Sequence, residues 1–281
     1  MTGLARDLLT PATGEPVVLA VGGFEILTSR REIVTIDLTP PHPRAQELVG
    51  VRAGGASRLA LSRVQGDIRG TPTYQLLDDF AGASLVAGWI WLRWMDRMPA
   101  SGGRRMVNVC TGFAEGASSL DADGFSRMEI QSHTEVGPQE NPEDPEGWHV
   151  MPVQEQRPQQ RRTRRIDLWR EGGLIKADVG FQDSGSSPLG GRTAVHEYRV
   201  FADIDEATGL LTALQSLPLI LPYAECPGAA VKAQRMIGRK VAGFREDVPE
   251  TLSHALGCTH LNDVLRSLAD VPALARSLPR D

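Results

Sequence analysis

The chain has 281 residues, enough for one large domain or two of ordinary size, and 41% of them are hydrophobic while 23% are charged. This composition is typical of a globular protein, and the net charge of −5 with scattered basic residues argues against a nucleic-acid partner. The three cysteines are an odd number and lie far apart, so we expect no disulfide framework and a reducing, cytoplasmic location.

The most apolar stretch, residues 81–94, is interrupted by two glycines, a serine and Arg93. It is too short and too broken to span a membrane, so it predicts a buried helix instead. The N-terminal residues contain no long apolar signal region, and we therefore expect neither secretion nor a membrane partner. The tryptophans in this stretch, Trp89, Trp91 and Trp94, would also suit the interface of a homodimer.

The first half of the chain predicts a strand pair followed by a long helix. Residues 17–27 and 32–38 alternate apolar and polar side chains, which is typical of a half-buried antiparallel pair. Thr71 and Pro72 then suit the N-cap and the first turn of a helix. Because the residues that follow are apolar on most sides, we expect this helix to lie centrally.

The second half of the chain repeats this plan. Five landmarks recur in the same order, and they pair residues 4–7 with 180–183, 20–24 with 194–198, 34–39 with 210–217, 48–50 with 236–238, and 71 with 259. The same number of positions separates Gly50 from Thr71 and Gly238 from Thr259. We interpret this as an internal duplication, and chance similarity between two α+β stretches is the alternative.

The sequence therefore predicts an α+β protein made of two similar halves. Each half would have a small, mostly antiparallel sheet and a long helix, and the halves would pack about a pseudo-two-fold with a pocket at or near their junction. The predicted parts are residues 1–99 as the N-terminal half, 100–165 as a long Pro-rich linker or loop, and 166–281 as the C-terminal half, which carries the His-Glu-Tyr and Gly-Cys-Thr-His-Leu motifs.

Basic residues gather only once, at Arg161, Arg162, Arg164 and Arg165. A short run of this kind is usually a solvated junction or the edge of a strand, and this is the interpretation that we favour. A site for phosphate or for an acidic partner is the alternative.

The best chemical signal lies where the last long helix should begin. Cys258 and His260 follow a glycine, and an apolar face then recurs at helical spacing, made of Leu261, Val264, Leu265 and Leu268. Two titratable groups would therefore lie at the positive end of a helix dipole, where a thiolate or a bound anion is stabilised.

Four motifs of the second half occur in a recognisable order. They are HEYRV from His196, PYAECP from Pro222, IGRKVAGFR from Ile237 and GCTHLNDVL from Gly257. Together they resemble the bacterial domain-of-unknown-function family 2889. The stretches LARDLLTP, LVGVRAGG and LLDDFAGASL in the first half resemble the longer members of that family. The resemblance implies no established reaction, but it makes Cys258 and His260 better candidates for a functional site.

General acid/base catalysis is the first chemistry that these residues allow. His260 or His196 would exchange a proton with the substrate, because an imidazole titrates near neutral pH. Glu197 or Asp183 would fix the tautomer of the histidine, and Asp263 is a further orienting group. The structural alternative is that His260 and Asp263 only cap the helix and that His196 hydrogen-bonds inside a sheet.

Two other chemistries stay open for the same residues. Cys258 could be a nucleophile whose proton a histidine takes, or it could be a small apolar filler at a packed helix start. A zinc site could use Cys226, Cys258, His260 and His196, although one residue between Cys258 and His260 is a poor chelate spacing and there is no Cys-x-x-Cys pair.

The first half and the predicted linker contribute candidate substrate-binding residues. Tyr74 and Asp78 are four positions apart and would share a face of the first long helix. Trp148 stands in a polar loop, where an aromatic side chain either contacts substrate or anchors the loop to the domain.

No phosphate-binding, nucleotide-binding or Gly-x-Ser-x-Gly motif is present, which disfavours a kinase or a hydride-transfer enzyme. We expect a cofactor-independent enzyme, a lyase or a hydrolase, that performs acid/base chemistry on a small, largely apolar metabolite, aromatic ones included. Its catalytic residues would be His260, His196, Glu197, Cys258 and Asp183. The alternatives are a module that binds a small molecule or a partner without catalysis, and a zinc-dependent hydrolase.

Overall fold

The computed structural model describes residues 1–95, 104–127, 134–151 and 157–280. These residues form two compact units, of which the first contains Met1–Val86, Glu140–His149 and Asp270–Asp281, and the second contains Ala87–Gln139 and Val150–Ala269. The boundary predicted between residues 99 and 100 lies outside the described residues. Each unit has its own antiparallel sheet together with helices, which confirms the predicted α+β class.

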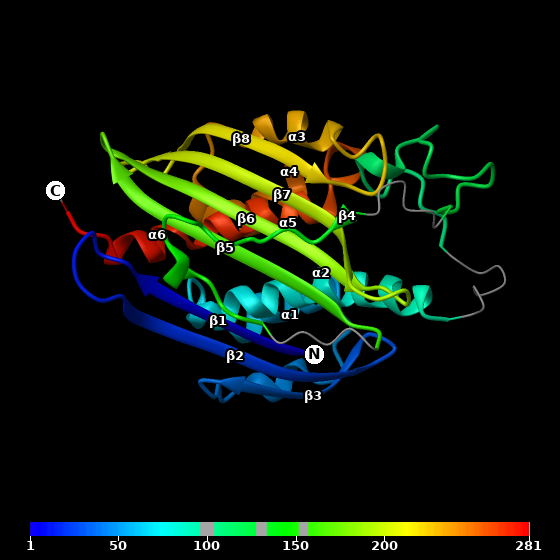
Figure 1. Cartoon of the computed structure of the whole chain (residues 1–281), viewed down its shortest axis with the longest axis horizontal. Helices are drawn as coiled ribbons and strands as arrows, with labels where there is room; N and C mark the ends of the chain where they lie inside the picture. Colours follow the sequence, from blue (N-terminus) through cyan, green and yellow to red (C-terminus); the bar gives the residue numbers. More distant parts are fainter. Residues whose placement is uncertain (96–103, 128–133, 152–156, 281) are drawn as a thin grey trace. The chain divides into compact units, whose positions relative to one another are not determined.

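The elements are labelled in Figure 1. The strands are β1 (Thr2–Leu9), β2 (Val17–Ser29), β3 (Glu32–Thr39), β4 (Thr134–Glu135), β5 (Gln160–Glu171), β6 (Leu174–Ser186), β7 (Arg192–Asp205) and β8 (Leu211–Ile220). The α-helices are α1 (Gly55–Val64), α2 (Pro72–Arg93), α3 (Gly228–Lys232), α4 (Phe244–Thr251), α5 (Thr259–Ser267) and α6 (Val271–Leu274). Short 3-10 helices, written η, are η1 (Ala45–Leu48), η2 (Gly66–Ile68), η3 (Thr111–Phe113), η4 (Pro145–Gly147), η5 (Ala233–Met236), η6 (Val241–Gly243), η7 (His254–Leu256), η8 (Leu268–Asp270) and η9 (Ala275–Ser277).

The sheet of the first unit is a meander in the order β1-β2-β3. The pair predicted from alternating side chains is β2 and β3, which run antiparallel with Ile26 opposite Ile36. One face of this pair is buried and the other is exposed, as the alternation requires. The helix prediction is also confirmed, because α2 begins at Pro72 and the N–H of Tyr74 donates to the Thr71 hydroxyl across 3.3 Å.

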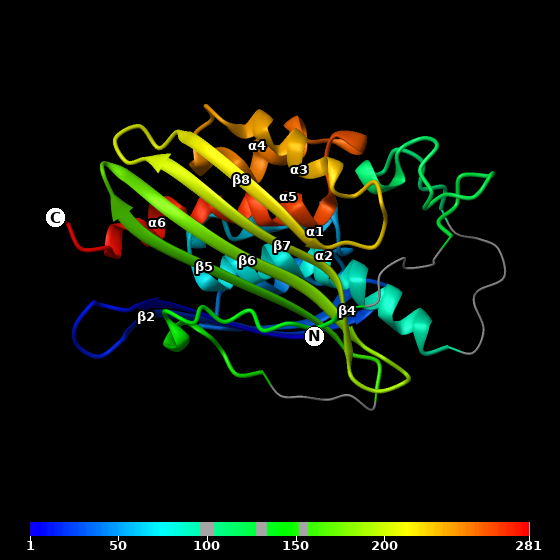
Figure 2. The ribbon, with the colours of Figure 1, turned by 45° about the horizontal axis from the view of Figure 1, so that its top comes forward.

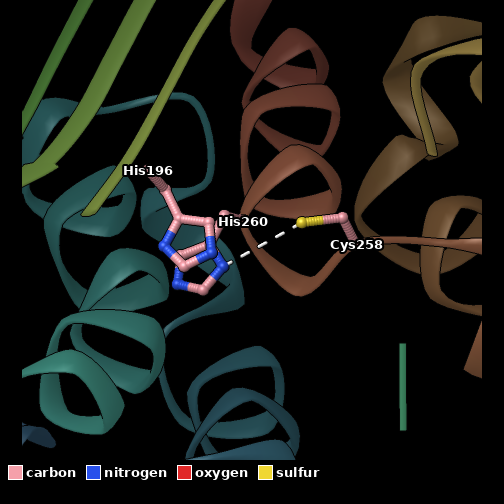
Figure 3. A group of neighbouring side chains, drawn as sticks. All are labelled: His196, Cys258 and His260. Carbon is pink, nitrogen blue, oxygen red and sulfur yellow. Dashed lines mark hydrogen bonds between the residues drawn. The ribbon is translucent and has the colours of Figure 1, made fainter. Parts of the chain in front are cut away.

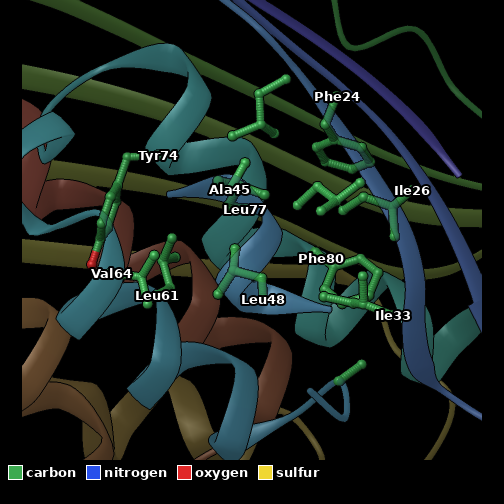
Figure 4. Packing of buried hydrophobic residues seen from close by; sticks show 13 residues of the cluster. Phe24, Ile26, Ile33, Ala45, Leu48, Leu61, Val64, Tyr74, Leu77 and Phe80 are labelled. Carbon is green, nitrogen blue, oxygen red and sulfur yellow. The ribbon is translucent and has the colours of Figure 1, made fainter. Parts of the chain in front are cut away.

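The buried face of β2 and β3 packs on helices of the same unit (Figure 4). Phe24 of β2 meets Phe80 of α2 edge to face, with ring centroids 6.4 Å apart and planes at 86°. The core cluster consists of Phe24, Ile26, Ile33, Ile36, Leu38, Ala45, Leu48, Ala53, Leu61, Val64, Tyr74, Leu77 and Phe80. This cluster therefore joins β2 and β3 to η1, α1 and α2.

The sheet of the second unit has the order β4-β7-β6-β5, and β8 pairs with the other edge of β7. Figure 2 shows α3, α4 and α5 on the same face of this sheet. The side chains at this contact are fully buried, and they include Val179, Phe181 and Val200 from the strands and Leu261 and Val264 from α5. Burial of apolar area between the sheet and the helices is the main stabilising term here, at about 25 cal/mol per Å².

In each unit, a turn that contains a glycine comes after the last strand of the sheet, and both glycines make the same kind of backbone hydrogen bond. The N–H of Gly50 donates to the Ile33 carbonyl across 2.8 Å, and the N–H of Gly238 donates to the Leu211 carbonyl across 2.8 Å. Both glycines have a positive φ, of 82° and 85° respectively, which side chains other than glycine rarely adopt. The sequence similarity between residues 48–50 and 236–238 thus coincides with one local backbone conformation.

A glutamine shortly before each of these glycines also makes the same contact. The Gln46 side-chain amide donates to the Ile36 carbonyl across 2.9 Å, and the Gln234 amide donates to the Leu214 carbonyl across 2.6 Å. Each pair joins a short 3-10 helix to the strand before it within one unit.

Among the described residues, no helix is both long enough and apolar enough to cross a membrane.

Candidate active site

The register of β6 and β7 places three polar side chains on one face of the second sheet. Asp183 of β6 lies opposite His196 of β7, and Phe181 lies opposite Tyr198. Because side chains alternate across a strand, these residues share the face that carries the helices. The sheet thus presents a carboxylate, an imidazole and a phenol to the elements packed on it.

Helix α5 brings the other two groups to this face. Cys258 is its N-cap residue and His260 lies in its first turn. The apolar face predicted for this helix, made of Leu261, Val264, Leu265 and Leu268, is fully buried, which confirms the helical spacing. Burial of these leucines and valine orients α5 so that its N-terminal turn meets β7.

His196 from the sheet and Cys258 from the N-terminal end of α5 lie beside His260 (Figure 3). The rings of His260 and His196 are stacked, with centroids 3.4 Å apart and planes at 13°. Nδ1 of His260 lies 4.0 Å from Sγ of Cys258, and Nε2 of His260 lies 3.6 Å from Oδ2 of Asp183. We call the four residues His260, His196, Cys258 and Asp183 the histidine centre. All four were predicted as catalytic residues, and the structure brings them together.

Arg162 of β5 fixes the carboxylate of the histidine centre. Its guanidinium donates to both oxygens of Asp183, across 2.9 Å and 2.7 Å, and also to Asp263 of α5 across 2.8 Å. The Arg162 side chain is only 5% exposed and both aspartates are buried. Gln160 donates a further hydrogen bond of 3.1 Å to Asp183. The carboxylate is therefore held rigidly beside His260.

The arginine run is divided between the two faces of β5. Arg162 and Arg164 both lie over the ring of Phe181, whereas Arg165 pairs with Asp178 across 3.1 Å on the other face. The expectation of a solvated run is wrong for Arg162, because the carboxylates that pair with it come from distant parts of the sequence. The alternation of Arg162 and Arg164 within a strand is the signal that could have indicated a buried arginine.

Burial sets the protonation of the histidine centre. It lowers the pKa of His196 well below 6.5, and the neighbouring His260 and Arg162 lower this pKa further, while Asp183 opposes them. Burial also raises the pKa of the Cys258 thiol, although the Tyr198 hydroxyl and the backbone amides of Leu261 and His260 act in the opposite direction. At neutral pH, His196 is therefore uncharged and Cys258 is a thiol.

Two further thiols, those of Cys110 and Cys226, lie near Cys258. A Cβ atom placed on Gly112 would lie 2.5 Å from Sγ of Cys226 and 3.9 Å from Sγ of Cys110, so both sulfurs border this glycine. Burial raises the pKa of Cys110 to about 11 and that of Cys226 higher still. All three cysteines are free thiols.

Tyr198 contributes a buried hydroxyl on the same side of the sheet. Its side chain is fully buried, and its hydroxyl forms no hydrogen bond of normal geometry with any described residue. The group interacts with the Cys258 thiol, and burial raises the pKa of Tyr198 well above 10. Tyr198 belongs to the His-Glu-Tyr motif, but sequence reasoning did not select it.

Three side chains of the centre have the types that bind transition metals. Ligand atoms of His196, Cys258 and His260 lie within 4.8 Å of one another. A metal ion, however, must lie about 2.0–2.1 Å from each nitrogen and in the plane of each ring. Planes inclined by 13° and 3.4 Å apart do not meet at that distance, so both stacked rings cannot bind one ion without turning.

Glu197 lies on the opposite face of the sheet from His196. Its carboxylate accepts hydrogen bonds from the amides of Gln182 and Gln139, across 2.8 Å and 3.1 Å. Adjacent residues of a strand point to opposite faces, so this carboxylate contacts its two glutamines and none of the residues of the histidine centre. The structure does not bring Glu197 together with the other predicted catalytic residues.

The three predicted substrate-binding residues belong to the first unit. Tyr74 and Asp78 are buried in α2, where Oδ1 of Asp78 lies 3.6 Å from Nε of Arg58. The Trp148 carbonyl accepts a hydrogen bond of 3.1 Å from Arg6. A role for these residues in substrate binding stays a prediction.

A hollow in the second unit borders the N-terminal end of α5. Polar groups of Cys110, Thr259 and Asn262 line it, together with the apolar residues Val109, Pro249 and Leu252 and with Ser253, His254 and Gly257. The side-chain oxygen of Asn262 has no hydrogen-bond partner among the described residues. Gly257 and Thr259, the two neighbours of Cys258 in sequence, both contribute to this lining.

Residues 160–274 match the model of a family described as a protein of unknown function, DUF2889. This segment is a DUF2889 domain. No curated protein and no solved structure matches the chain. The DUF2889 domain contains every residue of the histidine centre together with Arg162, Tyr198 and Asp263. The stretches of the first half that resemble longer members of DUF2889 lie outside the matched residues.

Proposed function

We propose that the chain is a cofactor-independent enzyme that performs proton-transfer chemistry, of lyase type or hydrolytic, on a small and largely apolar metabolite. One observation carries this proposal. The His260 imidazole has the Asp183 carboxylate beside one nitrogen, the Cys258 thiol beside the other, and the His196 ring on its face. A base oriented by a carboxylate and next to a reactive group is the usual layout of an acid/base centre.

His260 would be the general acid/base of the reaction. Asp183 favours the tautomer that carries hydrogen on Nε2, and this leaves Nδ1 with a lone pair that can accept a proton. The two hydrogen bonds from Arg162 hold the Asp183 carboxylate in place. His196 stays neutral beside it, because two imidazolium rings stacked at 3.4 Å would repel each other.

The lining of the hollow beside α5 supports the substrate class. The apolar residues Val109, Pro249 and Leu252 line it, and the polar residues beside them could orient a ligand. A small metabolite that is largely apolar but carries a polar group could contact both kinds of residue.

We also propose that the two sheets and the helices after them descend from one duplicated unit. The matched glycine turns and glutamine contacts support this. A contact between strand and helix is matched as well. In the first unit, Gly22 of β2 packs so closely on α2 that an added Cβ would lie 2.4 Å from the Thr73 nitrogen. At the corresponding place in the second unit, His196 of β7 stacks on His260 of α5.

Superposing residues 17–80 on residues 194–268 in an experimental structure tests this duplication. The proposal expects the strands β2 and β3 to fall on β7 and β8, with the starts of α2 and α5 aligned. A superposition in which the glycine turns at Gly50 and Gly238 do not coincide would contradict it.

The test of the enzymatic proposal is a substrate screen of the wild-type protein beside His260→Gln. The proposal expects turnover of small apolar esters, amides or hydroxy compounds by the wild type and a loss of about 100-fold or more in the variant. His42→Gln, in the first unit, is the matched control and should retain turnover. Equal turnover by His260→Gln and wild type would remove His260 from the mechanism.

Two competing functions predict other outcomes of the same work. A binding module would retain a ligand from the screen but convert none. A zinc-dependent hydrolase would contain about one zinc per chain by elemental analysis and would lose turnover when a chelator removes it. In that case one of the stacked rings would have to turn toward the ion.

A further inference from the structure

The side chains of Cys258, His260 and Asp183 form a chain of three groups that uses both nitrogens of one imidazole. The thiol faces Nδ1 at 4.0 Å and the carboxylate faces Nε2 at 3.6 Å. Cys258 also precedes the first turn of α5, a nine-residue helix whose N-terminal amides face the sulfur. A nucleophile, a base and a group that orients the base are the three parts of a covalent catalytic site, and their contacts are commonly longer in an empty site.

We propose that Cys258 is a nucleophile that forms a thioester with an activated acyl substrate, an ester or thioester of a small carboxylic acid. This inference rests on the proposed function, because His260 is the base in both. It goes further in naming the substrate class and a covalent intermediate.

The reaction balances with water as the only second reactant. Nδ1 of His260 takes the proton of the Cys258 thiol while the sulfur attacks the acyl carbon. The leaving alcohol or thiol departs with the proton that His260 returns, and the acyl group stays on the sulfur as a thioester. Water then attacks the thioester as His260 takes its proton. The carboxylic acid leaves and the thiol is restored with that proton.

A second observation points to a ligand at Cys258. His196 is nine-tenths buried and has a ring nitrogen within 4.8 Å of the Cys258 sulfur, and its Nδ1 has no hydrogen-bond partner among the described residues. Buried polar groups are rarely left in this condition unless a ligand or water satisfies them. The Tyr198 hydroxyl interacts with the sulfur, so its hydrogen can be donated to the oxygen of an acyl group bound there.

The hollow beside α5 lies next to Cys258, which is itself buried behind the lining. Gly257 and Thr259, the two residues that flank Cys258, line this hollow, and so does Cys110, whose pKa the nearby Cys258 sulfur raises. The proposal places the acyl group on this side of Cys258.

Acylation by p-nitrophenyl acetate and p-nitrophenyl butyrate tests the proposal without knowledge of the natural substrate. The wild type should release a burst of p-nitrophenolate close to one equivalent per chain. Intact-protein mass spectrometry should show one added acyl group, peptide mapping should place it on Cys258, and hydroxylamine should remove it. Cys258→Ala should show neither burst nor adduct, whereas Cys226→Ala is the matched control for a buried neighbouring thiol and should behave as wild type.

His260→Gln should acylate about 100-fold more slowly than wild type. Circular dichroism and thermal melting of each variant show that the protein is folded, and Cys258→Ser serves as the conservative second variant. Acylation of another residue, or failure of both esters to acylate the wild-type protein, would overturn the proposal.

Turnover of the substrate found by the screen separates this inference from the proposed function. If Cys258→Ala turns over that substrate at the wild-type rate while His260→Gln does not, the nucleophile falls and the acid/base centre stands. If both variants are as active as wild type, both proposals fall.

Discussion

The Tyr198 side chain is fully buried, and its hydroxyl interacts with the Cys258 thiol, whose sulfur is a weak hydrogen-bond acceptor. A buried hydroxyl with a weak partner stabilises the fold less than one with a regular hydrogen bond. Such a loss is usual where a residue is kept for binding or catalysis rather than for folding.

Replacing Tyr198 by Phe should therefore separate stability from activity. We expect the free energy of unfolding to change by at most about 1 kcal/mol, because only a hydroxyl with a weak acceptor is lost. Acylation by p-nitrophenyl esters should slow by about 10- to 100-fold, because a donor to the acyl oxygen is removed. Urea unfolding and burst kinetics measure the two effects. A marked loss of stability with unchanged acylation would assign a structural role to the hydroxyl.

His196 should make stability depend on pH in a defined direction. Its pKa in the fold lies well below 6.5, so the unfolded chain binds a proton more readily than the folded chain. The contribution of this group is therefore fully present above about pH 6.5, and it is lost at up to about 1.4 kcal/mol per pH unit as the pH falls below that value.

Urea unfolding between neutral and mildly acidic pH measures this slope. His196→Gln cannot take up the proton and should flatten the curve in that range. His254→Asn is the matched control, because His254 is exposed and its φ of 52° is tolerated by asparagine. The same slope in His196→Gln as in wild type would show that another group titrates there.

Two of the four residues of the histidine centre, Cys258 and His260, stand out from the sequence alone. A glycine, a cysteine and a histidine at the start of an amphipathic helix indicate a reactive helix N-terminus from local pattern. The role of Arg162 could not be predicted from local pattern, because its partners Asp183 and Asp263 lie 21 and 101 positions away along the chain. A salt bridge of that separation leaves no local pattern.

At the level of elements, β5 holds its place through buried charge. Arg162 is bound to Asp183 and Asp263 at a site where all three side chains are at most 5% exposed. Removal of the cation would take its charge and its hydrogen bonds away from two buried carboxylates.

Arg162→Met should lower the free energy of unfolding by about 3–5 kcal/mol. Arg170→Met on the same strand is the control, because the Glu206 side chain that pairs with Arg170 is 42% exposed and an exposed pair is worth at most about 1 kcal/mol. Chemical denaturation of both variants provides the comparison. Adding Asp183→Asn to Arg162→Met should recover part of the loss. Equal effects of the two single substitutions would contradict the buried ion-pair network.

Glycine has opposite roles in two elements. Gly22 of β2 lies against the first turn of α2, where an added Cβ would lie 2.4 Å from the Thr73 nitrogen. Gly88, in the same long helix, has nothing within 4 Å of an added Cβ. The first glycine permits close packing, whereas the second only weakens its helix.

Gly22→Ala should therefore destabilise the protein by about 1–3 kcal/mol, since a backbone atom cannot move aside as a side chain can. Gly88→Ala should stabilise it by about 0.5–1 kcal/mol. Thermal melting of both variants checks the signs. Stabilisation by Gly22→Ala would mean that β2 does not pack against the helix start.

Strands in which apolar and polar residues alternate could be predicted from the sequence, whereas a strand rich in charged residues could not. β2 and β3 follow from their apolar spacing and α2 from its Thr-Pro start, because these signals are local. β5 begins at Gln160, within the segment predicted as a linker. Its polar composition hides a strand because its buried charges are neutralised by neighbouring elements, which a local pattern does not show.

For the whole molecule, chain order is a poor guide to the units. Glu140–His149 and Asp270–Asp281 belong to the same compact unit as the first 86 residues. The sequence indicated two α+β parts in succession, but the return of two later segments to the first part depends on contacts between residues far apart in the chain. Short segments of ten or twelve residues carry too little pattern to predict those contacts.

We propose that Asp183 and His260 act as one acid/base unit. The decisive measurement is turnover of the best substrate from the screen by four proteins, namely the wild type, Asp183→Asn, His260→Gln and the double variant. We expect the double variant to be no slower than His260→Gln alone, because Asp183 acts only through His260. Losses that multiply in the double variant would show instead that the two residues act independently.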